Sequence, residues 1–165
     1  CLKEGYGDTS NLCHAVRSMS IPMTLYYLNK GQSPKLIWGH RQMFPLYLAA
    51  KNGHISMLRL LLQKGADPNQ KLFDGRTAMH RCAQYGHLEM IDVLKQAGGD
   101  INAQTTRYKE TPLHFAAEVK NEMTIGFLIK LGANWEITNS DGLTFYEILK
   151  EPECLPSQMV IVPAV

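Results

Sequence analysis

The residues of this chain best suited to nucleophilic or metal chemistry are its six histidines and four cysteines. They are His14, His40, His54, His80, His87, His114, Cys1, Cys13, Cys82 and Cys154. No two cysteines are spaced as C-x-x-C and no two histidines as H-x-x-x-H, the spacings typical of redox and metal sites. The phosphate-binding patterns G-x-x-x-x-G-K-S/T and G-x-G-x-x-G are absent too. We therefore expect no catalytic residue, no cofactor and no metal site.

Two of the histidines belong to a unit that repeats along the chain. Thr77-Ala78-Met79-His80 is followed, 34 positions later, by Thr111-Pro112-Leu113-His114. Gly98 and Gly132 are also 34 positions apart, and each precedes a short polar loop. Each unit contains a polar turn, a helical stretch, a two-residue break and a second helical stretch. Stacking of such units buries apolar faces that one unit cannot bury alone.

This unit resembles the ankyrin repeat, whose period is about 33 residues. The resemblance implies an all-α fold, an ankyrin-repeat solenoid of stacked helix-turn-helix units joined by β-hairpin loops. It also implies that His80 and His114 bond backbone across neighbouring turns. In that family, asparagines at the places of Asn69 and Asn102 can be hydroxylated, although a loop asparagine bonding its own backbone is the simpler interpretation.

The repeat pattern divides the chain into three parts. Residues 1–10 are a polar lead-in, 11–150 the ankyrin-repeat domain and 151–165 a C-terminal tail with an apolar stretch at 159–163. Within the domain we expect a degenerate first repeat, three further repeats and a cap, at residues 11–38, 39–71, 72–104, 105–138 and 139–150.

Local signals support the helices of these units. Leu58, Leu61 and Leu62 share one helical face, and Gly65 supplies the left-handed stop that ends a helix. Ser20 is placed to cap the second helix of the first repeat. Lys120-Asn121 stands where the two preceding repeats have Gly-His, so the usual sequence signal for the helix break is missing there.

Composition and charge restrict the class of partner. The net charge of +2 gives no general affinity for nucleic acid, and no apolar run is long enough to span a membrane. Residues 1–82 hold 11 Lys and Arg against 4 Asp and Glu, whereas residues 83–165 hold 6 against 11. We expect a partner protein with an acidic patch facing the N-terminal half. Cys82 takes a small, buried position, which indicates an inert thiol and a reducing compartment, cytoplasmic or nuclear.

The resemblance also places the partner-binding positions on the concave face, at the hairpin tips and after the Ala-Ala pair of each first helix. Aromatic and Arg side chains, the usual anchors of interfaces, are frequent there. Burial against neighbouring hairpins is the alternative explanation for these side chains. Trp135 is expected to cap the edge of the core, and Trp38 fits either role. The expected partner-binding residues are Arg41, Met43, Lys51, Asn52, Phe73, Arg76, Gln84, Tyr85, Arg107, Tyr108, Glu110 and Glu118.

These observations predict a monomeric, non-enzymatic module, a scaffold or adaptor that binds another protein through its concave face. The alternative is a targeting or regulatory ankyrin arm of a larger enzyme or host-directed effector, whose activity lies outside this segment. The two alternatives differ in where the activity resides.

Overall fold

The computed structural model describes residues 9–37 and 43–149 of the chain. Arg41, Trp38, Cys1, Cys154 and the 159–163 stretch lie outside the described residues. Within them the extended elements are all helices, Met43 forms an isolated β-bridge, and no β-strand is formed. The helices are α1 (Thr9–Arg17), α2 (Ile21–Asn29), α3 (Pro45–Lys51), α4 (Ile55–Gln63), α5 (Ala78–Tyr85), α6 (Leu88–Gln96), α7 (Pro112–Glu118), α8 (Glu122–Lys130) and α9 (Phe145–Leu149).

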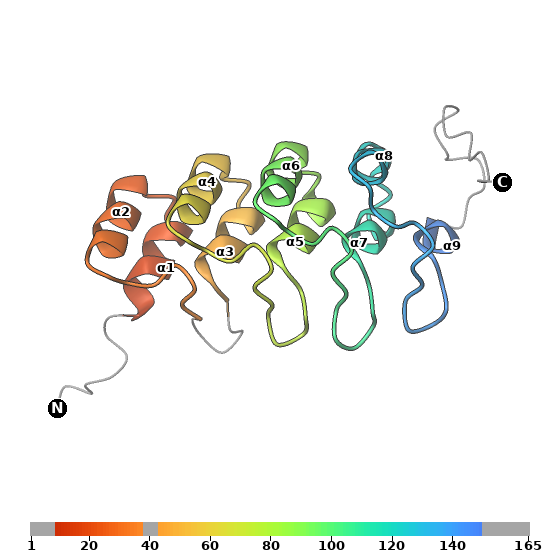
Figure 1. Ribbon diagram of the computed structural model, residues 1–165, viewed down its shortest axis with the longest axis horizontal. Helices are drawn as coiled ribbons and strands as arrows, with labels where there is room; N and C mark the ends of the chain where they lie inside the picture. The colour runs from red at the N-terminus through yellow and green to blue at the C-terminus, as the bar shows by residue number, and fades with distance from the viewer. Residues whose placement is uncertain (1–8, 38–42, 150–165) are drawn as a thin grey trace.

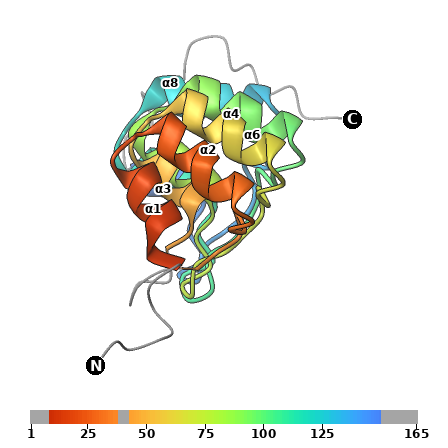
Figure 2. The ribbon, with the colours of Figure 1, turned by 90° about the vertical axis from the view of Figure 1, so that its left-hand side faces the viewer.

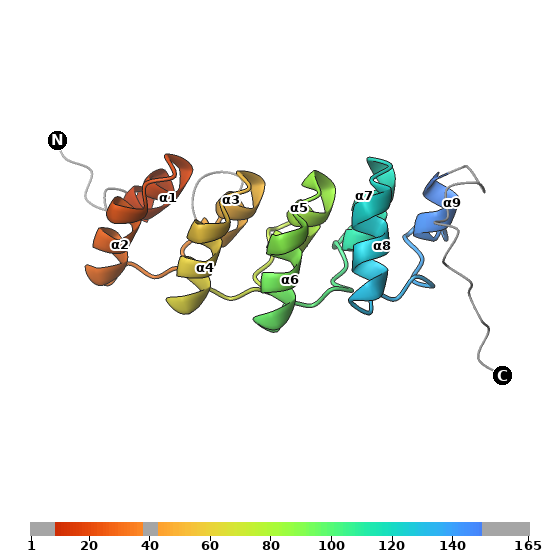
Figure 3. The same cartoon turned by 90° about the horizontal axis from the view of Figure 1, so that it is seen from above.

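The helices form two parallel layers. Helices α1, α3, α5, α7 and α9 make the first layer, and α2, α4, α6 and α8 make the second (Figure 1). Seen from one end, successive helix pairs lie one behind another along the long axis (Figure 2). Seen from above, the pairs follow one another in chain order (Figure 3). Loops extend from the first layer on one side (Figure 1). The expected all-α solenoid of stacked helix-turn-helix units is confirmed.

Polar side chains start the second-layer helices. Ser20 Oγ accepts a hydrogen bond from Met23 N at 3.4 Å, so the expected cap of α2 is present. His54 Nδ1 caps α4 in the same way, by accepting from Met57 N at 3.2 Å. At the α7–α8 break Asn121 takes over this role by accepting from Thr124 N at 3.0 Å. The Lys120-Asn121 pair therefore makes the same break as Gly-His.

The core lies between the two layers. Leu58, Ile91, Leu94 and Leu128 are fully buried there, and burial of each such side chain contributes about 1.5–3 kcal/mol. Cys82 is buried among them, and desolvation raises the pKa of its thiol to about 12. The expected inert core thiol is confirmed, because no thiolate forms at neutral pH.

His80 and His114 connect α5 and α7, respectively, to the loop of the following repeat. His80 Nδ1 accepts a hydrogen bond from Thr77 N at 3.1 Å, while His80 Nε2–H donates to Glu110 O at 3.1 Å. His114 makes the equivalent bonds to Thr111 N, at 3.2 Å, and to Leu143 O, at 3.1 Å. The cross-turn bonds that the resemblance implied are therefore present.

The loops between repeats are closed like hairpins and bonded to one another. Leu72 N donates to Arg76 O at 2.8 Å, which closes the first described loop. Thr106 N donates to Asp74 O at 2.9 Å and so joins the next loop to it. Gly75 at this junction has φ +83, and a Cβ there would lie 2.5 Å from Thr106 N. The described loops before α5 and α7 are therefore joined side by side, and we call this side of the solenoid the loop row.

The expectation about the Asn69 side chain was wrong. Asn69 bonds the next repeat rather than its own backbone, since its side chain accepts from Asp100 N at 2.7 Å and donates to Gly98 O at 2.9 Å. Trp135 is 40% exposed, and its expected place at the edge of the core stays a prediction. In addition, α1 begins at Thr9, two residues before the expected start of the repeat domain.

Candidate functional site

Two adjoining cavities open between the loop row and the first helix layer, and together we call them the hairpin groove. The smaller cavity, about 250 Å³, is lined by Met43, Tyr47, Lys51, Leu72, Phe73, Asp74, Arg76 and Arg81. The larger cavity, about 770 Å³, is lined by Phe73, Asp74, Arg76, Gln84, Thr105, Thr106, Arg107, Tyr108, Glu110, Phe115, Glu118 and Asp141. Phe73, Asp74 and Arg76 line both cavities and separate them.

The hairpin groove brings together most of the residues expected to bind a partner. Those that line it are Met43, Lys51, Phe73, Arg76, Gln84, Arg107, Tyr108, Glu110 and Glu118. Asn52 and Tyr85 do not line either cavity, and Arg41 lies outside the described residues. The positions chosen from the repeat register therefore converge on one surface, with two exceptions.

Tyr85 is excluded from the groove by its place at the end of α5. Its ring stacks on His87, with the ring centroids 5.9 Å apart, and Arg81 Cζ lies 5.8 Å from its centroid. Tyr85 thus packs over the α5–α6 break, although 49% of its surface is exposed.

The aromatic residues at the loop tips face solvent. Phe73 is 68% exposed and Tyr108 is 49% exposed. Burial against neighbouring loops, the alternative considered from the sequence, does not account for Phe73. An exposed Phe next to a cavity is a surface whose burial by a partner would be favourable, by about 25 cal/mol per Å² of apolar area.

The guanidinium groups of the hairpin groove are held in place by neighbours. Arg76 Nε pairs with Asp74 Oδ2 at 2.8 Å, and Arg76 Cζ lies 5.8 Å from the centroid of the Phe115 ring. Arg107 Cζ lies 5.1 Å from the centroid of the Tyr108 ring. Cation–π contacts of this kind fix the charge at a definite position before any partner arrives.

Arg81 is a groove residue that sequence reasoning missed. Its Nε donates to the Tyr47 hydroxyl at 2.5 Å and its Nη1 donates to Gln84 Oε1 at 2.6 Å. Arg81 Cζ also lies 5.2 Å from the centroid of the Tyr47 ring. A signal was present, because Tyr47, Arg81 and Phe115 follow one another at intervals of 34 residues. A large side chain recurring at one register position marks a surface shared by successive repeats.

Glu110 and Glu118 lie together at the other end of the groove. Burial raises the pKa of Glu110, and the charge of Glu118 and a hydrogen bond to its carboxyl group raise it further. Arg76 acts in the opposite direction. Two carboxyl groups this close repel each other when both are ionised, so a proton or another cation between them is stabilising.

His, Cys, Asp and Glu side chains are the groups that could ligate a metal ion or act as nucleophiles. Across residues 9–37 and 43–149, no three His, Cys, Asp or Glu residues are grouped so as to hold a metal ion. The two buried thiols in the same ranges, Cys13 and Cys82, are free, and burial raises the pKa of each to about 12. None of the helices in the described part of the chain is long and apolar enough to cross a membrane.

Comparisons with known proteins agree with this architecture. A family model of ankyrin repeats, built from three copies, matches residues 12–105 and again residues 46–139. The chain is 32% identical over 101 residues to the ankyrin repeat protein FPV031 of fowlpox virus. The matched segment makes up 60% of this chain and 30% of the viral protein.

Two longer vertebrate proteins are also similar. Ankyrin repeat and SOCS box protein 3 of Bos taurus is 43% identical over 99 residues, covering 60% of this chain and 19% of that protein. Palmitoyltransferase ZDHHC13 of Homo sapiens is 38% identical over 133 residues, covering 80% of this chain and 21% of that protein. The chain therefore spans less than a third of the length of each of these three relatives.

Proposed function

The chain belongs to the ankyrin-repeat family, and from that premise we propose that it binds a partner protein through the hairpin groove, without catalysing a reaction. The observation that carries the proposal is the position of Phe73 and Tyr108, which are exposed aromatic side chains on the walls of the groove. Aromatic and Arg side chains at the centre of a surface are the usual anchors of protein interfaces.

The proposed mechanism is binding to a surface that is already ordered. Thr106 N bonds Asp74 O across adjacent loops, and Arg76 is paired with Asp74. Because these groups are positioned in advance, little side-chain or loop entropy is lost on binding. The excess of Lys and Arg in residues 1–82 supports an acidic partner surface facing the N-terminal half, which would accelerate association. We propose a monomeric module of a reducing compartment, cytoplasmic or nuclear.

The test compares capture of proteins by three forms of the chain. The forms are wild type, Phe73→Ala with Tyr108→Ala, and Met123→Ala as a matched control. Met123 is 75% exposed on α8, in the second helix layer. Met123→Ala therefore removes exposed apolar surface outside the groove. We expect a protein retained by wild type and by Met123→Ala to be lost by the double variant, as measured by quantitative mass spectrometry.

Circular dichroism spectra and melting temperatures of the three forms serve as folding controls. Equal retention by all three forms would contradict the proposal, because the binding surface would then lie outside the groove. Loss from Met123→Ala alone would move the surface to the second helix layer.

A second candidate function is a targeting or regulatory arm of a larger protein. The similar segment makes up 21% of palmitoyltransferase ZDHHC13 and 19% of ankyrin repeat and SOCS box protein 3. In that case the partner bound by the groove would be a substrate or a location signal for an activity elsewhere. An immunoblot of the native protein decides, since a free-standing module runs near 18.6 kDa.

A further inference from the structure

The two cavities of the hairpin groove carry opposite charge. Apart from Asp74 and Arg76, which line both cavities and pair with each other, the smaller cavity has Lys51 and Arg81 and no carboxylate. The larger has Glu110, Glu118 and Asp141 against the single cation Arg107. The groove is therefore basic towards α3 and acidic towards α7 and α9. The sign of its charge changes along the long axis of the solenoid.

One position of the repeat builds much of this gradient. Lys51, Gln84 and Glu118 follow the small-residue pairs of α3, α5 and α7 at intervals of 33 and 34 residues. Successive repeats thus present a cation, a neutral amide and an anion at the same place. Helices α3 and α5 pack together, as do α5 and α7. At about 8–10 Å between the axes of packed helices, Lys51 and Glu118 are roughly 16–20 Å apart.

Each end of the groove offers a charge to a partner. Arg81 is oriented by the Tyr47 hydroxyl and by Gln84, so its guanidinium is ordered before binding. At the other end, Glu110 faces the carboxyl group of Glu118. A guanidinium or ammonium group placed between these two carboxylates would relieve their repulsion and form charge-assisted hydrogen bonds. Phe73, between the two cavities, supplies apolar surface.

We propose that the hairpin groove accepts an extended segment of a partner protein with two opposite charges in a fixed order. An acidic side chain lies at Lys51 and Arg81, an apolar side chain lies on Phe73, and a basic side chain lies at Glu110 and Glu118. This inference rests on the proposed function and adds the chemistry and the polarity of the partner. An extended chain rises about 3.3 Å per residue, so the acidic and the basic side chain are about five or six positions apart in the partner.

The experiment starts from a displayed library of random linear 12-residue peptides selected on the whole chain. We expect the enriched peptides to carry an Asp or Glu and an Arg or Lys about five or six positions apart, with an apolar residue between them. The best peptide, and a second version in which its acidic and basic residues are exchanged, are then synthesised. Their dissociation constants are measured by fluorescence anisotropy.

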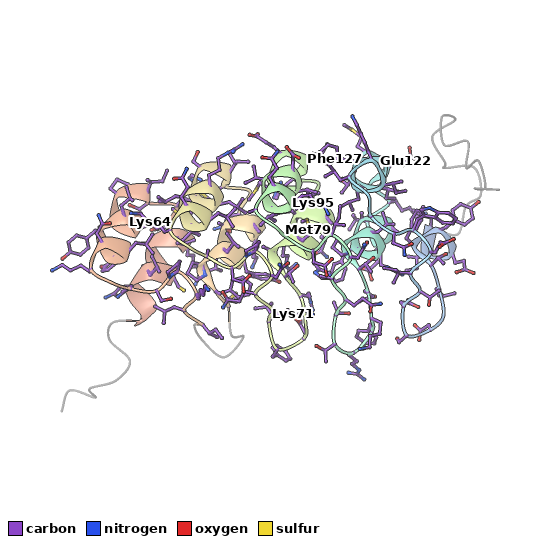
Figure 4. All side chains as sticks on the ribbon, viewed as in Figure 1. Lys64, Lys71, Met79, Lys95, Glu122 and Phe127 are labelled. Carbon is purple, nitrogen blue, oxygen red and sulfur yellow. The ribbon has the colours of Figure 1, made fainter. Side chains whose placement is uncertain are left out.

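A charge exchange in the protein tests the polarity. Lys51→Glu with Glu118→Lys leaves the net charge unchanged and reverses the two ends of the groove. We expect this variant to bind the original peptide about tenfold more weakly, as for loss of a charge-assisted contact, and to prefer the exchanged peptide. The matched control is Lys64→Glu with Glu122→Lys. Figure 4 labels these two residues at the end of α4 and on α8, away from the loop row.

The outcomes separate this inference from the proposed function. If Phe73→Ala weakens binding but the charge exchange does not, the groove binds a partner without reading charge, and the inference is overturned. If neither change affects binding, the peptide lies elsewhere and both proposals fail. Enrichment of peptides without the paired charges, or no enrichment at all, also overturns the inference. Reversal of peptide preference by the groove variant alone supports it.

Discussion

At the scale of single residues, His80 is both a helix cap and a link between repeats. It accepts from Thr77 N, donates to Glu110 O, and packs edge-on against Phe115 with the ring centroids 5.1 Å apart. Because Nδ1 accepts only while it carries no proton, the two bonds together are made by the neutral imidazole with its proton on Nε2. Burial of the ring lowers the pKa of His80 to about 4, although the bond to Glu110 O acts to raise it. The link that holds the groove loop in place is thus sensitive to acid.

Because of this histidine, the stability of the protein should decrease as the pH is lowered. The pKa of His80 is lower in the folded chain than its ordinary 6.5, so the unfolded chain binds the proton more strongly. The stabilisation is complete above about pH 6.5 and declines as the pH falls towards 4, by up to about 3 kcal/mol. His114 acts in the same direction, because burial lowers its pKa as well.

The measurement is urea denaturation at pH 7 and pH 4.5 for wild type, His80→Gln and His14→Gln. We expect His80→Gln to be less stable than wild type at pH 7 and this difference to shrink at pH 4.5. His14 is exposed on α1, so His14→Gln is the control. Its free energy of unfolding should differ little from that of wild type at both pH values. A difference for His80→Gln that is independent of pH would show that the titration of His80 does not affect folding.

At the scale of elements, the loops between repeats are similar in form but differ in their turn residues. Gly75, Lys109 and Gly142 occupy equivalent places at intervals of 34 and 33 residues. All three have positive φ values, of +83, +56 and +75. A side chain in the left-handed region costs about 1–2 kcal/mol, which glycine avoids. Lys109 therefore strains the loop that carries Tyr108.

Replacing Lys109 by glycine should stabilise the protein. We expect Lys109→Gly to raise the free energy of unfolding by about 0.5–1 kcal/mol, since relief of the positive φ exceeds the added entropy of the unfolded chain. The control is Lys71→Gly in the preceding loop (Figure 4), because Lys71 has no positive φ to relieve. Differential scanning calorimetry of both variants provides the measurement. A lower melting temperature for Lys109→Gly would mean that the loop tolerates the lysine without strain.

At the scale of the whole molecule, each repeat contacts mainly its neighbours. Helix α7 packs against α5 on one side and α9 on the other, and His114 bonds Leu143 O in the loop before α9. The short helix α9, the last that the structure describes, buries Phe145 and Leu149. In such a one-dimensional stack, damage at one end should reach adjacent repeats more than distant ones.

Truncation of Phe145 should therefore loosen the C-terminal repeats selectively. Phe145→Ala removes a buried ring and should lower stability by about 3–5 kcal/mol. In native-state hydrogen exchange, we expect amides of α7 to lose more protection than those of α3. Tyr146→Ala, which removes the neighbouring but exposed ring, should change protection little. Equal loss of protection in α3 and α7 would mean that the solenoid opens as one cooperative unit.

Much of the architecture follows from the sequence because each repeat is specified locally. The interval from Thr77 to Thr111 places the first-layer helices, and Ser20 and Asn121 begin the helices that follow them. Register then identifies which positions face the loops, so Lys51 and Glu118 could be assigned to one surface before any coordinates existed. Periodicity predicts these features because the hydrogen bonds within a helix or turn depend on residues a few positions away.

Only the tertiary structure decided where individual side chains point. Tyr85 leaves the groove to stack on His87, whereas Arg81 turns into it to meet Tyr47, a residue 34 positions earlier. Asn69 likewise bonds Asp100 in the following repeat. These choices depend on partners from adjacent repeats, which periodicity aligns but does not specify. The sequence by itself determined the solenoid and the surface available for binding, and packing between repeats determined which side chains that surface offers.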